Sequence, residues 1–249
     1  MITASSWDYP EGGGSSDKDE AIPFDARSSL ERDIGYSFRN AALLETAMSH
    51  RSWSNMFDGA PSYERLEYLG DAVLSLVVAD YTYKKWSDLQ EGPLAKIRSD
   101  VVSQLALAEI ATKIGLGDLI KLGKGEIAEG GRSKPSILSD VLEALIGAIY
   151  IDNDSDLQAV YEIIIGWLEE PIEQASKSPG MYNYKESLQM IVQKDSGELP
   201  EYIVDGKGPD HSRRFNACVY INGELKGSGS GSSKKNAEQM AAKSALQNI

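Results

Sequence analysis

The sequence predicts an all-α domain followed by a smaller domain with the element order α-β-β-β-α. Apolar residues recur with helical spacing from about residue 28 to residue 175, and no segment there alternates convincingly with the period of a strand. The breaker cluster Ser176-Lys177-Ser178-Pro179-Gly180 then interrupts the helical pattern. Beyond it, residues 214–221 alternate with period 2 and lead into Asn222-Gly223, a dipeptide typical of β-hairpin turns.

Residues 1–27 are predicted to form a disordered tail. They contain Gly12-Gly13-Gly14-Ser15-Ser16 and mixed charges, with too little apolar surface to offset the entropy of ordering. The start resembles no signal peptide, and no apolar run reaches the roughly 20 residues of a membrane helix. The single cysteine, Cys218, excludes an intramolecular disulfide and favours a reducing compartment. We therefore expect a cytoplasmic protein that does not enter a membrane.

The first domain is expected to span residues 28–175 and to be built from helices alone. Its periodic segments begin near Ala41, Tyr63, Leu94, Ser136 and Leu157. Pro171 and the breaker cluster are expected to end the last helix, because proline cannot continue the backbone hydrogen bonds. Residues 176–182 are the predicted linker to the second domain.

The second domain is expected to span residues 183–249. Its helices and strands are predicted over residues 184–193 (helix), 201–204, 214–221 and 224–229 (strands) and 233–247 (helix). Ser232 or Ser233 can cap the last helix, since a serine side chain accepts from the free amides of a first turn.

Five carboxylates form the most informative pattern. Glu64, Glu67 and Asp71 follow the spacing i, i+3, i+7, and Asp140 and Glu143 follow i, i+3. At 3.6 residues per turn, each set lies on one face of its helix. An acidic pair of this kind is most often a solvated surface, so the neighbouring residues decide how the pattern is interpreted.

The neighbours of these carboxylates are apolar. Residues 73–79 are apolar almost all round, and the second pair opens the apolar stretch 137–150. Acidic groups inside core helices repel one another and lose hydration, so a cation is needed to compensate them. An all-oxygen ligand set points to Mg²⁺, for which Mn²⁺ can substitute, and not to zinc.

These residues also carry a family resemblance. The run from Glu64 to Asp71, continued by Ala72-Val73-Leu74, resembles the nine-residue signature of the ribonuclease III family. Residues 134–148 resemble the second catalytic segment of that family, in the same order along the chain. Residues 47–52 and 91–94 match as well, and the resemblance covers roughly residues 28 to 249. Tyr63 is a departure, since asparagine commonly precedes the first glutamate in this family.

The second domain resembles a double-stranded-RNA-binding domain. Local matches are Leu188-Gln189, the segment 208–211 and the segment 229–238, which enters the last helix. The resemblance implies that RNA is contacted by Gln189, His211, Ser233, Lys234 and Lys235. Such domains read shape, phosphates and 2′-hydroxyls, so little sequence specificity is expected.

The acidity of the chain does not exclude a nucleic-acid partner. The formal net charge of the chain is -13, yet the segment from residue 183 onward contains nine basic and eight acidic residues and is nearly neutral. The acidity therefore lies in the tail and the first domain, where bound metal would neutralise part of it. Arg98 and Arg132 are candidate contacts to the RNA backbone in that domain.

The resemblance implies metal-assisted hydrolysis of double-stranded RNA by a homodimer that is formed through the endonuclease domain. Cleavage at each active centre would give RNA products with a 5′-phosphate, a 3′-hydroxyl and a short 3′ overhang. The resemblance also implies a role in the processing of rRNA and other RNAs. Four residues map onto the catalytic carboxylates of the family: Glu67, Asp71, Asp140 and Glu143. Asp71 and Glu143 are the expected catalytic pair, and Glu64 and Glu91 have supporting roles. One-metal and two-metal mechanisms both remain open.

Two further residues are interpreted through their surroundings. Gly70 lies inside a predicted helix, which suggests a close backbone approach, and the resemblance assigns it to the dimer interface. His50 is interpreted as a capping or packing group in preference to a general base. The alternative functions are a non-cleaving double-stranded-RNA binder and a structural or ribosome-associated protein.

Overall fold

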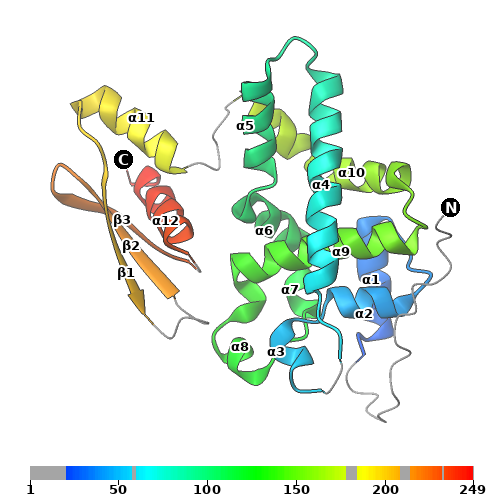
Figure 1. Ribbon diagram of the computed structural model, residues 1–249. Helices are drawn as coiled ribbons and strands as arrows, with labels where there is room; N and C mark the ends of the chain where they lie inside the picture. The colour runs from blue at the N-terminus through cyan, green and yellow to red at the C-terminus, as the bar shows by residue number, and fades with distance from the viewer. Residues whose placement is uncertain (1–20, 58–59, 178–183, 208–213, 232, 249) are drawn as a thin grey trace. The chain divides into compact units, whose positions relative to one another are not determined.

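The computed structural model describes residues 21–57, 60–177, 184–207, 214–231 and 233–248 (Figure 1). The chain divides into two compact units, one up to Ile172 and one from Glu173 onward, and each is described by itself. Most of the predicted tail lies outside the described residues. Among the described helices, none is both long enough and apolar enough to cross a bilayer.

The first unit is helical throughout, in agreement with the predicted fold class. Its elements are α1 Phe24–Ile34, α2 Ala41–Ala47, α3 Arg51–Ser54, α4 Glu64–Lys85, α5 Glu91–Val101, α6 Gln104–Lys113, α7 Leu116–Leu119, α8 Lys124–Ala128, the 3₁₀ turn η1 Gly131–Ser133, α9 Pro135–Asp152 and most of α10 Leu157–Lys177, which continues past Ile172. The helix expected near Leu94 begins three residues earlier, at Glu91.

Helix α9 is the centre of this unit. It begins with Pro135 at its first position, where the missing amide proton costs nothing, and most of its residues are buried. It crosses α4 in Figure 1 and packs against α2 and α6 as well. A helix that is apolar nearly all round is stable only when other helices cover it, and this arrangement fulfils that condition.

Two glycines allow α4 and α9 to cross at close range. A Cβ atom on Gly70 would lie 1.8 Å from the carbonyl oxygen of Glu143, and one on Gly147 would lie 2.2 Å from that of Leu66. The close approach predicted for Gly70 is thus confirmed. Its assignment to a dimer interface is wrong, because Gly70 is buried against α9 of the same chain.

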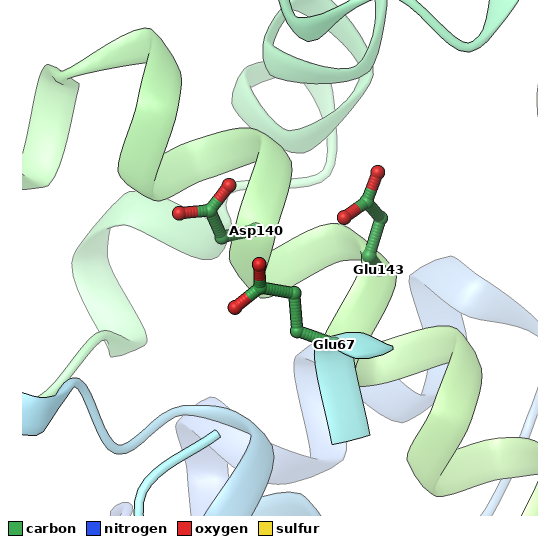
Figure 2. Close-up of side chains that lie close together, drawn as sticks. All are labelled: Glu67, Asp140 and Glu143. Atoms are coloured by element: carbon green, nitrogen blue, oxygen red, sulfur yellow. The ribbon is translucent and has the colours of Figure 1, made fainter. Parts of the chain in front are cut away.

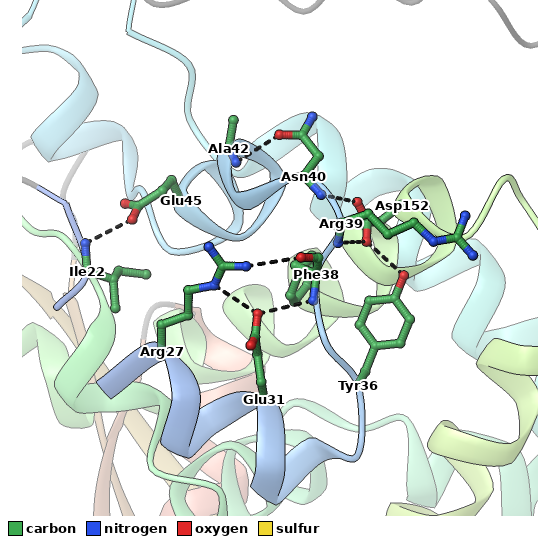
Figure 3. Close-up of polar contacts among 10 residues, drawn as sticks. All are labelled: Ile22, Arg27, Glu31, Tyr36, Phe38, Arg39, Asn40, Ala42, Glu45 and Asp152. Atoms are coloured by element: carbon green, nitrogen blue, oxygen red, sulfur yellow. Dashed lines mark hydrogen bonds and ion pairs between the residues drawn. The ribbon is translucent and has the colours of Figure 1, made fainter. Parts of the chain in front are cut away.

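Helix α1 begins at Phe24, inside the segment predicted as a tail. Polar contacts hold it in place (Figure 3): Arg27 donates to the carbonyl of Phe38 at 3.0 Å and to Glu31 at 2.8 Å. Leu30 and Ile34 are its buried residues. The last four residues of the predicted tail are therefore ordered by contacts with the domain that follows.

Helix α10 ends at Lys177, inside the predicted breaker cluster, but Pro171 does not interrupt it, contrary to that part of the prediction. Proline removes one backbone hydrogen bond, but Ile164, Leu168 and Ile172 are buried on one face of the helix and packing maintains it. The boundary between the two compact units follows Pro171 directly, between Ile172 and Glu173.

The second unit has the predicted α-β-β-β-α order. Its elements are α11 Tyr184–Ser196, β1 Glu201–Lys207, β2 Arg214–Ile221, β3 Glu224–Gly231 and α12 Lys234–Leu246. The strands form an antiparallel sheet in the order β1-β2-β3. Asn222 and Gly223 connect β2 to β3 with φ values of 53° and 77°, the left-handed conformations that a two-residue hairpin turn requires. Ala217 and Val219 share a core with residues from both helices.

Candidate active site

Three carboxylates converge where α4 and α9 cross. Figure 2 shows Glu67 on α4 pointing toward Asp140 and Glu143 on α9. Each side chain offers one oxygen atom, and these oxygens all lie within 4.8 Å of one another. All three residues are half-buried, so the group is open to solvent on one side.

The helix crossing places these side chains. Glu67 lies one turn before Gly70 on α4, and Glu143 lies one turn before Gly147 on α9. Because the two glycines bring the backbones together, the carboxylates one turn away meet as well. Residues more than 70 positions apart in the sequence thus form one site.

The electrostatics of the cluster are unfavourable without a cation. Burial, together with the charge of Asp140 and other carboxylates, raises the pKa of Glu67 to about 7. Burial, followed by the charges of Asp71, Asp140 and Glu67, raises the pKa of Glu143 to about 8. Burial also raises the pKa of Asp140, although hydrogen bonds from Ser139 and Tyr63 oppose that shift.

The donor set fits a hard divalent cation. Three carboxylate oxygens are near enough to share one ion, and oxygen ligands are what Mg²⁺ and Mn²⁺ prefer. The neighbouring charges that act on Glu67 and Glu143 are all carboxylates. A bound cation would remove their repulsion and compensate for the hydration that they lose on burial.

Of the other predicted carboxylates, Asp71 and Glu64 act electrostatically on this group, and Glu91 does not. Asp71 is exposed, one turn beyond Glu67 on α4, and is not among the three residues that converge. Its charge still reaches Glu143, whose pKa it helps to raise. Glu64 is exposed in the first turn of α4, where it accepts a hydrogen bond from Ser62 at 2.8 Å. Glu91 is exposed at the start of α5.

The predicted RNA contacts of the second unit lie on its helices. Gln189 is exposed on α11. Ser233 caps α12 by accepting from the amide of Asn236 at 3.1 Å, as the sequence predicts. Lys234 and Lys235 are exposed in the first turn of that helix, near amides that attract anions. His211 lies outside the described residues.

The two arginines predicted to contact RNA differ in their surroundings. Arg98 is exposed in the last turn of α5. Arg132 is exposed too, but its Nη1 donates to the carbonyls of Gly117 and Asp118, both at 2.9 Å. Part of its guanidinium group therefore fixes the loop before α9.

Two aromatic residues pack against each other before α4. Tyr63 is 3% exposed, and burial together with the charges of Asp140 and Glu67 raises the pKa of its hydroxyl. His50 is buried against the Tyr63 ring and accepts from the Ser52 amide, which confirms that it is a capping and packing group. The sequence marked Tyr63 only as a departure from the family pattern. The sequence feature that could have drawn attention to Tyr63 is its position as an aromatic residue directly before the first acidic residue.

Comparison with known proteins decides the family. A sequence profile described as "Ribonuclease-III-like" matches residues 40–166, and one described as "Double-stranded RNA binding motif" matches residues 184–249. The chain is 45% identical over 220 residues to "Ribonuclease 3" of Streptomyces coelicolor, covering 88% of this chain and 79% of that protein. The chain belongs to the ribonuclease III family. "Ribonuclease 3" of Thermobifida fusca is 46% identical over 207 residues, or 83% of this chain and 85% of the relative.

A solved structure agrees with this assignment. The nuclease domain of ribonuclease III from Campylobacter jejuni is 40% identical, with a TM-score of 0.53, and the match covers 57% of this chain and 96% of that domain. Membership of the ribonuclease III family makes the chain an endoribonuclease of double-stranded RNA. The family depends on metal, and the three converging carboxylates are residues that could hold it.

Proposed function

We propose that the chain is a Mg²⁺-dependent endoribonuclease that hydrolyses double-stranded RNA to 5′-phosphate and 3′-hydroxyl ends with a short 3′ overhang. The convergence of Glu67, Asp140 and Glu143 on one half-buried point supports this proposal. By analogy with its family, the enzyme would act in the cytoplasm on rRNA precursors and other structured transcripts, and Mn²⁺ would substitute for Mg²⁺.

The carboxylates have distinct proposed roles. Glu67 and Glu143, whose pKa values are raised most, would ligate the metal directly, and Asp140 would hold the metal or its water. Bound Mg²⁺ supplies a water of lowered pKa and stabilises charge on the phosphate. Asp71 is exposed beside this group, where it would hold the metal or its waters, and with Glu143 it forms the proposed catalytic pair.

The remaining proposed residues position the RNA. Glu64 and Glu91 are exposed near the starts of α4 and α5 and would assist RNA placement or product release. Five residues of the second unit would contact phosphates and 2′-hydroxyls: Gln189, His211, Ser233, Lys234 and Lys235. Arg98 and Arg132 would contact the RNA backbone near the site of cleavage.

A homodimer is proposed through the exposed face of α4. Tyr68, Leu76 and Tyr83 are 82%, 54% and 72% exposed along this helix, an unusual number of large apolar side chains in water. The nuclease domain of the Campylobacter jejuni protein shows structural flexibility in a region that is involved in dimer formation. Two copies joined through α4 would cover these side chains.

Cleavage of end-labelled double-stranded RNA tests the proposed function. Wild type is expected to cut with Mg²⁺ and to stop when Mg²⁺ is chelated. Glu143→Gln is expected to bind the RNA in a gel-shift assay with unchanged affinity and to leave it uncut. If wild type binds the RNA and never cuts it, the chain is a non-cleaving binder and the proposal is wrong.

A further inference from the structure

An ion pair joins the two helices of the second unit that carry proposed RNA contacts. Gln189 lies on α11, Lys234 and Lys235 lie in the first turn of α12, and the two helices pack against each other (Figure 1). Lys185 of α11 pairs with Glu238 of α12, with Nζ 2.5 Å from Oε2. The two helices are thus connected at a defined point by residues that lie 53 positions apart in the sequence.

A hydrogen bond from the backbone of Lys185 makes a second connection. The amide of Lys185 donates to Oε1 of Gln239 on α12 at 3.1 Å. This amide lies in the first turn of α11, where backbone donors have no partner within their own helix. A side chain of α12 supplies the partner, so both the backbone and the side chain of Lys185 are bound to that helix.

Tyr202 of β1 lies beside the same ion pair. The Lys185 ammonium is 4.5 Å from the centroid of the Tyr202 ring, which is a cation–π arrangement. Burial, followed by the charge of Glu238, raises the pKa of Tyr202 to about 12. The side chains of Lys185 and Glu238 are 34% and 23% exposed, so water and salt screen this pair less than a surface pair.

The ion pair lies one helical turn from proposed RNA contacts on both helices. Lys185 precedes Gln189 by four positions on α11, and Glu238 follows Lys234 by four positions on α12. Residues four positions apart lie on the same face of an α-helix. A connection between Lys185 and Glu238 therefore restricts the distance between Gln189 and Lys234.

This distance matters for the recognition of double-stranded RNA. A domain of this kind contacts two successive minor grooves and the phosphates between them, and it recognises mainly their shape. The intervals between these contacts are set by the RNA. A protein that already presents its side chains at matching intervals loses less free energy in ordering them on binding. Residues that set the interval can therefore raise affinity without touching RNA.

We propose that Lys185 and Glu238 are positioning residues, whose ion pair sets the spacing of α11 and α12 for binding double-stranded RNA. The proposal rests on the proposed RNA contacts of these two helices. It gives Glu238, an acidic residue, a favourable role in binding a polyanion, which charge alone does not predict. Lys185 is correspondingly a basic residue of the RNA-binding domain that binds within the protein.

Neutralisation of Glu238 separates positioning from simple charge. Glu238→Gln removes a negative charge and releases Lys185, so electrostatic attraction alone predicts tighter RNA binding. Positioning predicts the opposite, binding that is about tenfold weaker, because a hydrogen bond between charged groups is lost. Gel shifts of the full-length protein with double-stranded RNA and a chelator, which prevents cleavage, measure the affinity. Unchanged or tighter binding would overturn the proposal.

Glu224→Gln is the matched control. Glu224 pairs with Lys226 at 2.7 Å and its side chain is 73% exposed, so this variant makes the same change of charge in the same unit. Both residues belong to β3, so their ion pair connects no two elements. Because exposed pairs contribute little, the RNA affinity should stay within about twofold of wild type. Equal losses in Glu224→Gln and Glu238→Gln would overturn the proposal.

Cleavage kinetics and thermal unfolding distinguish positioning from general stability. With Mg²⁺, Glu238→Gln should show a KM about tenfold higher and an unchanged kcat, because binding is weakened and the nuclease site is intact. A lower melting temperature with unchanged RNA affinity would show that the ion pair only stabilises the domain. That result would overturn the proposal.

Exchange of the two charges tests the pair itself. Lys185→Glu and Glu238→Lys should each weaken RNA binding, and the double variant should regain much of the loss because the ion pair can form again. Losses that add in the double variant would overturn the proposal. Where a single variant fails to fold, the double variant decides, and its failure to fold would count against the pair. If wild type binds no double-stranded RNA, the proposed function fails first, which separates the two proposals.

Discussion

The two ends of α9 place acidic groups in opposite situations. Near its end, Asp152 is 7% exposed and accepts three hydrogen bonds of 2.8 Å, from the Tyr36 hydroxyl and the amides of Arg39 and Asn40 (Figure 3). Near its start, Asp140 and Glu143 are more exposed than Asp152, yet they face another carboxylate and their pKa values are raised.

The difference shows that burial alone does not mark a functional acid. Asp152 is the more buried carboxylate, but its partners satisfy it and bind the chain before α2 to the end of α9. Only burial and other carboxylates act on Glu67 and Glu143 among the described groups, and both effects disfavour their charged forms. A protein retains such a costly arrangement where it serves function. The partners of a carboxylate therefore separate a structural role from a catalytic one.

The largest expected effect follows from exchanging one acid of the cluster and the acid at the other end of α9. Glu67→Gln should lower cleavage on the order of a thousandfold, because metal stabilisation of the reacting phosphate is worth several kcal/mol. Asp152→Asn should reduce the free energy of unfolding by about 2 kcal/mol, since a buried amide donor is left unsatisfied, and should leave cleavage below its melting temperature unchanged. Single-turnover cleavage and urea unfolding measure the two effects. A large loss of cleavage in the Asp152 variant would erase the distinction.

A change in the helix crossing should have the next largest effect. In Gly70→Ala the new Cβ would overlap the Glu143 carbonyl, so α4 and α9 must separate. The expected cost is about 3 kcal/mol of unfolding free energy, accompanied by loss of cleavage. Gly166→Ala in α10 is the control, because nothing lies within 4 Å of its Cβ and a gain of about 1 kcal/mol is expected. Equal stability of Gly70→Ala and wild type would contradict the described crossing.

The raised pKa values predict a pH dependence with a defined sign. The pKa of Glu143 is about 8 in the folded protein against 4.5 ordinarily, so the folded state binds a proton that the unfolded chain has released in this range. Its stabilising contribution is present below about pH 4.5 and is lost as pH rises toward 8. Without metal, Glu143→Gln should therefore gain stability relative to wild type, increasingly from pH 4.5 to 8.

Urea unfolding in the presence of a chelator measures that difference. The comparison between the two proteins cancels other titrating groups, such as His50, whose pKa burial lowers and whose effect has the opposite sign. A gain that is constant with pH would show that Glu143 does not titrate as described.

The sequence predicted correctly those elements that depend on residues close together in the chain. The alternation in residues 214–221 and the turn residues Asn222-Gly223 determine the hairpin, and Ser233 caps the helix that follows it. The helical spacing predicted that Glu67 lies on one face of its helix and that Glu143 lies on one face of a second helix. Their meeting depends on how α4 crosses α9, which spacing does not contain; the family resemblance supplied that step.

The predictions that failed concern features that tertiary contacts decide. Phe24–Ile34 has few apolar residues and is ordered by the contacts of Arg27 and Glu31 with a later segment. Proline normally ends a helix because it cannot donate a backbone hydrogen bond. At Pro171, burial of one face of α10 outweighs the loss of that bond. Gly70 signals close approach, and its sequence context does not tell whether the partner helix belongs to the same chain.

Unfolding free energies measured against Mg²⁺ concentration at pH 8 test the central claim most directly, since ligand bound only to the folded state stabilises it. We expect wild type and Asp152→Asn to gain stability with increasing Mg²⁺, whereas Glu143→Gln should gain little or none. Equal stabilisation of Glu143→Gln and wild type, or no stabilisation of wild type, would contradict a metal site built from Glu67, Asp140 and Glu143.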